Sequence, residues 1–441
     1  MDPALAGLAL NSGWVPATVD LVALALLAFA VVGRADKWIA FTVATAAGVA
    51  VGLLTCWLAT DQLDLFGVSL SPVSRAWVGA AFGGVAAAVE AMILGPRRRR
   101  VVAGLAIPAL LIAGAFGVNA DFGQYPTVGS LTGRPVAAPL PPGVLATQAS
   151  GAPGSTAIGA EGRADPLWQR PPSGRMPDHG LVGSVSIPGT QSHFPARPAY
   201  IYLPPAALTA HPARLPVLVL LSGQPGGPAN VVESGKVAQI FDAFARTHHG
   251  VAPIVVAPDQ LTAPQVNPMC VDSAIGRSAT YLTVDLPRWI RQHLTVQVTP
   301  DAWAIGGFSE GGTCSLQLGA AHPELFGGIV DVAGEIAPSN GDESQTIDRG
   351  FGGSRAAYRA ALPLQVLAAH HYGRTVAILG TGEFDVVYGP IARRLGAAMA
   401  SAGMRVSLAV SPGTSHDWHT VQWVLRTQLD PIYRQFGLEG R

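Results

Sequence analysis

The first 120 residues contain four almost entirely apolar runs, separated by short stretches that carry charges. Each run is close to the length of about 20 residues that a helix needs to cross the hydrocarbon core of a bilayer. Tryptophan residues lie near the ends of the runs, where interfacial aromatic side chains are common. The pattern predicts a transmembrane region at residues 1–120, with helices at about residues 15–33, 38–59, 77–94 and 101–120.

The charges between the apolar runs predict how this region is oriented. Arg34 and Lys37 follow the first run and Arg97–Arg100 follow the third, whereas Asp61 and Asp64 lie between the second and the third. Loops rich in Lys and Arg stay on the cytoplasmic side of a membrane. Both ends of the region, and with them the rest of the chain, are therefore expected on the outer side. No basic segment opens the chain, so we expect no cleaved signal peptide.

Beyond residue 120 the pattern changes twice. Residues 121–178 are rich in Pro, Gly, Ala and Ser without apolar periodicity, which is typical of an extended linker. Residues 179–441 then alternate short apolar runs with segments of helical periodicity. This alternation predicts an α/β domain with a mainly parallel sheet and helices on both faces. The expected strands lie near residues 182–187, 199–203, 216–221, 254–257, 329–332, 376–379 and 406–410, and one more opens the stretch 303–312.

One of the expected strands ends in a candidate nucleophile motif. Gly307-x-Ser309-x-Gly311 lies in the stretch 303–312, which reads as a buried strand, a sharp turn of glycines with the serine at its apex, and the start of a helix. A sharp strand-to-helix turn exposes a serine hydroxyl at the sheet edge, and glycines are needed where side chains would clash. The pentapeptide alone is a weak signal, but this setting favours Ser309 as a catalytic nucleophile.

A serine nucleophile needs a histidine base and an acid that orients the histidine. In the chain order typical of this fold class, the acid and then the histidine follow the serine. His416 lies directly after the strand at 406–410 and is favoured as the base. His419 is less favoured because it enters the last expected helix.

The acid is expected after the strand at 376–379. Two carboxylates stand there, and Asp385 is favoured over Glu383. Asp417 is a more distant alternative, because a residue adjacent to His416 in the chain would point elsewhere.

The oxyanion of an acyl-transfer intermediate requires two aimed N–H groups. The backbone of Glu310, the residue after the nucleophile, is expected to supply one. The other should come from the loop that follows Leu221. Because Pro225 has no N–H, Gln224 is the expected donor.

The chain has three cysteines. Cys56 falls inside the second apolar run, where it is expected to pack as a small apolar side chain. Cys270 and Cys314 fall in the part expected outside the membrane, where oxidising conditions would let them form a disulfide. The sequence gives no distance between them and leaves the pairing open.

Composition excludes several classes of protein. Charged residues make up only 13% of the chain, and Lys plus Arg equals Asp plus Glu at 28 each. A nucleic-acid partner would need a basic surface that this balance does not supply. No His, Cys and Asp cluster has metal-ligand spacing and no GxGxxG follows a strand. We therefore expect no metal and no cofactor.

Five segments of residues 180–437 carry a resemblance to a known family, at residues 216–227, 281–290, 306–312, 321–326 and 415–418. Taken together, they resemble the motifs of the putative esterase family of α/β-hydrolases, which includes esterase D, enterochelin esterase and the antigen 85 mycolyltransferases. The resemblance implies an α/β-hydrolase fold, with Ser309 as nucleophile, His416 as base and Gln224 as first oxyanion donor. The composition and the predicted membrane anchor are similar to those of an actinobacterial envelope protein.

The sequence thus predicts a multi-pass protein of the cell membrane with an extracytoplasmic serine esterase domain that acts on lipid or cell-envelope esters. Two alternatives remain open. One is an acyltransferase that passes the acyl group to an envelope alcohol, and the other is an inactive hydrolase fold that serves as a scaffold or binding protein. A transporter is disfavoured because only Asp20 and Glu90 bring charge into the apolar runs.

Overall fold

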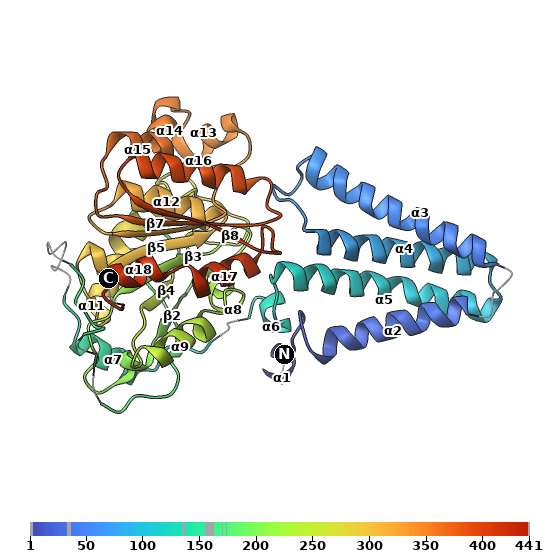
Figure 1. Ribbon diagram of the computed structural model, residues 1–441, viewed down its shortest axis with the longest axis horizontal. Coiled ribbons are helices and arrows are strands. Elements are labelled where there is room, and N and C mark those ends of the chain that lie inside the picture. The colour runs from blue at the N-terminus through green and yellow to red at the C-terminus, as the bar shows by residue number, and fades with distance from the viewer. Residues whose placement is uncertain are drawn as a thin grey trace. The chain divides into compact units, whose positions relative to one another are not determined.

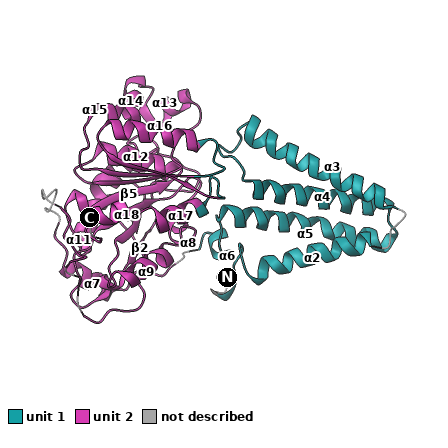
Figure 2. Ribbon diagram, in the orientation of Figure 1, with its two compact units in different colours: residues 1–134, 382–387, 413–419 teal, residues 135–381, 388–412, 420–441 magenta. Residues whose placement is uncertain are grey.

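The computed structural model describes residues 3–32, 37–134, 137–154, 163–169, 171–172 and 174–439. The chain divides into two compact units, shown in Figure 2. The bundle unit comprises residues 1–134, 382–387 and 413–419, and the hydrolase unit comprises residues 135–381, 388–412 and 420–441. Two short loops from the C-terminal part of the chain thus belong to the same unit as the apolar N-terminal region.

Four long helices make up most of the bundle unit (Figure 1), and all four are long and apolar enough to cross a membrane. They start up to five residues earlier than the apolar runs suggest, because polar first turns continue the same helices. Arg34, one of the charges used to predict orientation, lies outside the described residues. The long helices are α2 (Trp14–Val31), α3 (Trp38–Cys56, extended by the π-helical η2, Trp57–Gln62), α4 (Pro72–Leu94) and α5 (Arg97–Phe122), and the short ones are α1 (Pro3–Ala6) and α6 (Val128–Leu131).

The helices of the bundle approach one another closely through small residues. A Cβ atom added to Gly48 of α3 would lie 2.5 Å from the carbonyl oxygen of Phe82 on α4. One added to Gly114 of α5 would lie 2.7 Å from Cβ of Ala81 on α4. Lipid is as apolar as the helices, so such close van der Waals packing is what holds membrane helices together.

The hydrolase unit is built on an eight-stranded sheet with the order β1-β2-β4-β3-β5-β6-β7-β8. Strands β3 to β7 pair in parallel, while β1 and β2 are antiparallel to their neighbours. The mainly parallel sheet expected from the sequence is confirmed. The strands are β1 (Leu181–Val185), β2 (Ala199–Leu203), β3 (Val217–Leu221), β4 (Ile254–Ala257), β5 (Trp303–Phe308), β6 (Gly328–Val332), β7 (Val376–Gly382) and β8 (Arg405–Ser411).

Helices cover this sheet and bury its apolar side chains. One core cluster joins residues of α12, α15 and α16 to residues of β6 and β7, among them Leu316, Leu367, Leu395, Ile329 and Leu379. The helices and helical turns are α7 (Pro142–Ser150), η3 (Pro205–Leu208), α8 (Pro228–Glu233), α9 (Val237–Thr247), α10 (Ser278–Thr280), η4 (Tyr281–Asp285), α11 (Leu286–His293), η5 (Pro300–Ala302), α12 (Glu310–Ala321), α13 (Glu343–Phe351), α14 (Arg355–Ala361), α15 (Pro363–Ala369), α16 (Tyr388–Ser401), α17 (Trp418–Thr427) and α18 (Asp430–Gln435).

Residues 121–178, expected to form an extended linker, are in part packed into the two units. The first part of this segment, up to residue 134, belongs to the bundle unit. Further along, the N–H of Leu140 donates to the carbonyl of Ser184 in β1 at 3.0 Å. Gln148 of α7 is fully buried and donates to the carbonyl of Ala207 at 2.6 Å. Residues near 138–151 are thus part of the hydrolase unit. Backbone and amide hydrogen bonds hold them there, and such bonds do not produce an apolar periodicity in the sequence.

Candidate active site

Ser309 stands at the sharp turn between β5 and α12. Its backbone has φ 57° and ψ −119°, a conformation in which a residue with a side chain is strained. The Ser309 N–H donates to the carbonyl of Val332 in β6 at 2.8 Å, and Thr313 N–H donates back to the Ser309 carbonyl at 3.0 Å. These bonds fix the turn, so the half-buried serine is held at the carboxyl end of its strand.

The flanking glycines allow the chain to cross itself at this turn. A Cβ atom at Gly307 would lie 2.3 Å from the carbonyl oxygen of Gly311. A Cβ atom at Gly311 would lie 2.4 Å from the carbonyl oxygen of Ser222, at the end of β3. Neither position has room for a side chain, which is the physical reason for the spacing seen in the sequence.

The two predicted oxyanion donors lie on backbone segments that adjoin Ser309. Glu310 is the first residue of α12, so its N–H has no acceptor within the helix. The loop of Gln224 passes beside the nucleophile, since a Cβ atom at Gly223 would lie 3.3 Å from Cβ of Ser309. The Gln224 side chain donates to the carbonyl of Gln265 at 3.2 Å and so helps to hold this loop.

A buried ion pair, which the sequence analysis missed, supports the same loop. The Arg197 guanidinium donates to both oxygens of the fully buried Asp259, at 2.7 and 3.0 Å. It also donates to the carbonyl of Gly226 at 3.0 Å. Arg197 and Asp259 are 62 positions apart and follow no motif, so no local pattern could have identified them.

Gln260 links the oxyanion loop to the residue after the nucleophile. Its side-chain amide donates to the carbonyl of Ser222 at 2.6 Å and to the Glu310 carboxyl at 2.9 Å. Glu310 is itself buried. Burial raises the pKa of the Glu310 carboxyl to about 8, although the hydrogen bond from Gln260 favours the charged form. The side chain of Glu310 is thus mostly protonated at neutral pH.

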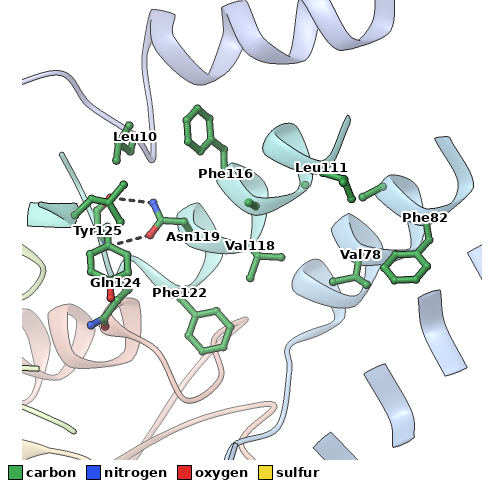
Figure 3. A pocket seen from close by; sticks show the side chains of 14 residues that line it. Leu10, Val78, Phe82, Leu111, Phe116, Val118, Asn119, Phe122, Gln124 and Tyr125 are labelled. Carbon is green, nitrogen blue, oxygen red and sulfur yellow. Dashed lines mark hydrogen bonds between the residues drawn. The ribbon is translucent and has the colours of Figure 1, made fainter. Parts of the chain in front are cut away.

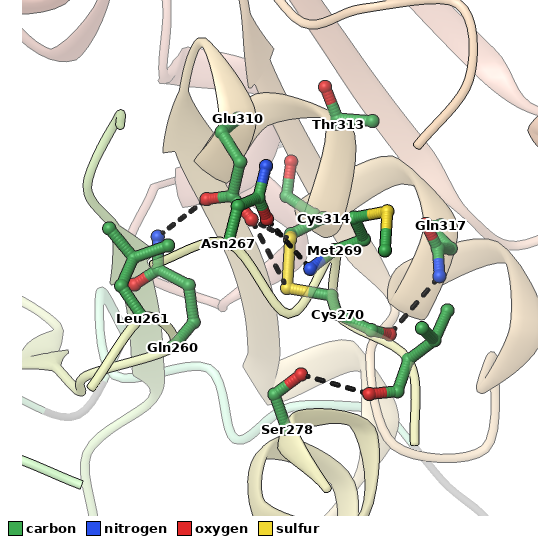
Figure 4. The surroundings of a disulfide bond; sticks show 12 residues. Gln260, Leu261, Asn267, Met269, Cys270, Ser278, Glu310, Thr313, Cys314 and Gln317 are labelled. Carbon is green, nitrogen blue, oxygen red and sulfur yellow. Dashed lines mark hydrogen bonds between the residues drawn. A yellow bond between two sulfur atoms is a disulfide. The ribbon is translucent and has the colours of Figure 1, made fainter. Parts of the chain in front are cut away.

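The disulfide that the sequence analysis left open is present. Cys270 and Cys314 are bonded with their Cα atoms 5.5 Å apart, which ties the loop before α10 to the nucleophile helix (Figure 4). Glu310 Oε1 lies 3.0 Å from Cys314 Sγ. Among the residues that the structure describes, these three are the one group with potential metal ligands in reach of one another. Sulfur atoms joined in a disulfide offer no thiolate to a metal.

The predicted base and acid are brought together. His416 Nδ1 lies 3.1 Å from Asp385 Oδ2, and the two residues are only 5% and 3% exposed. Asp385 stands three residues after the end of β7, and His416 stands five residues after the end of β8. A buried carboxylate at Nδ1 holds the proton there and leaves Nε2 as the basic nitrogen.

The competing acids make other bonds. Glu383 is exposed, and its carboxylate accepts a hydrogen bond from the N–H of Gly413 at 2.7 Å. The Asp417 carboxylate accepts from the N–H of Ser415 at 2.6 Å. Both shape the histidine loop, while Asp385 is the acid that contacts the ring.

The loop of His416 is also bonded to the ends of the apolar helices. All of these contacts lie within the bundle unit, and they flank the histidine on both sides. A Cβ atom added to Gly123 would lie 3.3 Å from Cβ of Trp418, so the loop and the end of α5 are in contact. The bonds run from Ser415 Oγ to the Ser69 carbonyl (3.0 Å), from Trp418 Nε1 to Gln124 Oε1 (2.8 Å) and between His419 Nε2 and the Ala120 carbonyl (2.8 Å).

Comparisons with known proteins show the family of the chain. The model of the family described as Putative esterase matches residues 195–410. An uncharacterized protein of Corynebacterium glutamicum is 33% identical over 350 residues, which cover 78% of each chain. The chain belongs to the putative esterase family. Residues 135–441 make up less than 78% of this esterase, so the match to the Corynebacterium protein extends into the apolar region.

One solved structure supports the fold, and a second is also similar to the chain. A ferulic acid esterase superposes on this esterase with a TM-score of 0.50 at 16% identity, covering 58% of this chain and 98% of that one. An S-formylglutathione hydrolase from Agrobacterium tumefaciens gives 0.49 at 20% identity, covering 60% and 98%. Family and fold together identify the protein as an α/β-hydrolase, a serine hydrolase that acts on ester bonds.

Proposed function

We propose that the protein is a membrane-anchored, extracytoplasmic serine esterase that hydrolyses lipid or cell-envelope esters with Ser309 as nucleophile, His416 as base and Asp385 as acid. The buried Asp385–His416 pair carries this proposal. A surface histidine needs no buried carboxylate at Nδ1, whereas a general base needs one to hold its tautomer and to stabilise the imidazolium that forms.

The reaction proceeds in two halves. The Ser309 hydroxyl gives its proton to His416 Nε2 while Oγ attacks the ester carbonyl carbon. The N–H groups of Gln224 and Glu310 stabilise the resulting oxyanion. The intermediate collapses to an acyl-serine, and the imidazolium returns the proton to the departing alcohol. Water then attacks the acyl-serine with His416 again as base, which releases the acid and restores the serine.

Two observations support an extracytoplasmic location. Lys37 precedes α3 and Arg97–Arg100 form the first turn of α5, at the helix ends expected on the cytoplasmic side, and the hydrolase unit is therefore expected on the other side. The disulfide between Cys270 and Cys314 is of a kind that persists in oxidising compartments. Four apolar helices keep the site near the bilayer, so an ester of a lipid or of the envelope is the substrate within reach.

The proposal is tested with the full-length protein in detergent, because the loops of Asp385 and His416 belong to the bundle unit. A fluorophosphonate probe is expected to label the wild type and to lose labelling in Ser309→Ala and His416→Ala. Ser273→Ala, which removes another hydroxyl of the hydrolase unit, is the matched control and should label normally. A folded wild type that is not labelled would contradict the esterase assignment and favour the scaffold.

Location is tested separately in intact cells. An impermeant maleimide is applied to a variant with a new cysteine at the exposed Arg355 of α14 (Arg355→Cys) and to a second variant with Arg98→Cys. We expect the maleimide to label the cysteine at position 355 and not the cysteine at position 98. The reverse pattern would place the hydrolase unit in the cytoplasm.

A further inference from the structure

The bundle unit contains an apolar groove with a volume of about 610 Å³, within the range of about 300–1,000 Å³ that ligand sites occupy. Its walls come from α4 and α5, and segments before α2 and after α5 close it. Figure 3 shows Val78 and Phe82 towards one end and Gln124 and Tyr125 towards the other. Among the described residues, no charged side chain lines the groove.

Small residues shape this groove. Ala81 on α4 and Gly114 on α5 bring the two helices into close contact, and Ala115 on α5 lines the groove at an exposed position where a larger side chain would fill it. Phe116 and Phe122 add aromatic side chains to the lining. Both helices are apolar enough to lie in hydrocarbon, so the ligand that gains most from this lining is a hydrocarbon chain delivered by the bilayer.

The polar end of the groove joins the loop of the catalytic base. The Asn119 amide is used locally, because it donates to the Tyr125 carbonyl and accepts from the Tyr125 N–H, both at 2.9 Å. Gln124 accepts from Trp418 Nε1 at 2.8 Å, and Trp418 is two residues after His416. The groove therefore runs from the apolar helices to the segment that holds the proposed base.

We propose that this groove binds the acyl chain of the ester substrate, with the methyl end among Val78 and Phe82 and the ester end beside Gln124. This inference rests on the proposed esterase function and adds to it a substrate class, esters of long-chain fatty acids. Short acyl esters leave the groove empty, so the groove selects for chain length while the triad supplies the chemistry.

The test compares two matched variants of the full-length protein in detergent. Ala115→Phe fills the groove at an exposed position on α5. Ala47→Phe makes the same change at an exposed position on α3 that does not line the groove. Hydrolysis of p-nitrophenyl acetate and p-nitrophenyl palmitate is measured for each. Ala115→Phe is expected to lower kcat/KM for the palmitate at least about tenfold and to leave the acetate within about twofold, whereas Ala47→Phe changes neither.

An equal loss of kcat/KM on both esters in Ala115→Phe, or no loss on either, would overturn the inference. If the wild type hydrolyses neither ester, the proposed function fails instead, so the two failures are distinct.

A second measurement needs no turnover. A diazirine-bearing palmitate ester is irradiated with the Ser309→Ala protein in nanodiscs, and crosslinks are expected in the peptide of residues 111–125. Equal labelling of α3 would mean surrounding lipid only and would contradict a dedicated site.

Discussion

The proposed nucleophile and the proposed base are held in different ways. Around Ser309 the supporting groups are side chains of the hydrolase unit, with the Arg197–Asp259 pair and Gln260 fixing the oxyanion loop. Around His416 they come from the bundle unit, where backbone carbonyls and Gln124 at the ends of the apolar helices accept hydrogen bonds from the loop. One half of the proposed site is thus supported by the hydrolase unit, and the other half is supported by the ends of the apolar helices.

This difference means that the apolar helices are more than an anchor. A change near the nucleophile should alter the stability of the hydrolase unit. A change at the helix ends should alter the placement of the base and leave the sheet intact. Four predictions test this division.

The largest effect is expected at the acid. Asp385→Asn keeps the shape of the side chain but favours the wrong tautomer of His416, so kcat should fall about 10⁴-fold with KM little changed. Glu383→Gln is the control on the same loop and should lose less than about tenfold, because Glu383 contacts Gly413 rather than the ring. Steady-state kinetics of both variants on a short ester are the measurement. The opposite ranking would make Glu383 the acid.

On the nucleophile side, Asp259→Ala should lower the stability of the hydrolase unit. It leaves the partly buried Arg197 charge without its partner, which costs about 3 kcal/mol. Thermal unfolding in detergent is the measurement. Arg355→Ala removes an exposed ion pair with Glu343 and should cost less than about 1 kcal/mol. Equal shifts in the two variants would mean that the buried pair does not support the fold.

The raised pKa of Glu310 predicts a pH dependence with a definite sign. The folded state binds the proton more tightly than the unfolded chain, since burial raises the pKa from 4.5 to about 8. This contribution to stability is complete below pH 4.5 and is lost as the pH rises to about 8, with a slope of at most about 1.4 kcal/mol per pH unit. Glu310→Gln should flatten the dependence of the unfolding midpoint on pH in that window. An unchanged slope would show that Glu310 is not the titrating group.

The smallest effect is expected on the base side. Gln124→Leu removes the acceptor of the Trp418 N–H, and losing one hydrogen bond of about 1 kcal/mol should lower kcat on a short ester about fivefold. Gln124 is a positioning residue, so KM and the unfolding midpoint should hardly change. Gln124→Glu keeps an acceptor oxygen and should restore kcat to within about twofold. A lower midpoint with unchanged kcat would mean that the contact is only structural.

The strongly patterned parts of the molecule could be predicted from the sequence. Hydropathy alone located the four helices, and strand runs followed by Gly-rich or polar loops located Ser309 and His416. The pairing of Asp385, rather than Glu383, with the histidine required coordinates, because both carboxylates follow the same strand. The disulfide likewise needed a distance between two cysteines 44 residues apart.

The sequence could not reveal contacts that join distant, aperiodic segments. Arg197 and Gln260 lie in loops with no motif, and their roles arise only where the loops meet. The segment around Gln148 lacked apolar periodicity, because buried amide hydrogen bonds rather than apolar side chains hold it. The groove of the bundle depends on the small side chain of Ala115, and a hydropathy profile records such a residue as apolar without its size.

The bundle unit draws on three separate stretches of chain, and the last of them ends at residue 419. During synthesis the four helices emerge first, and residues 135–412 must follow before the loop of His416 can reach them. Completion of the site is therefore a late event in the maturation of the protein. A chain cut short before residue 413 would keep its four helices and Ser309 yet lack the proposed base, so we expect such premature products to have no esterase activity.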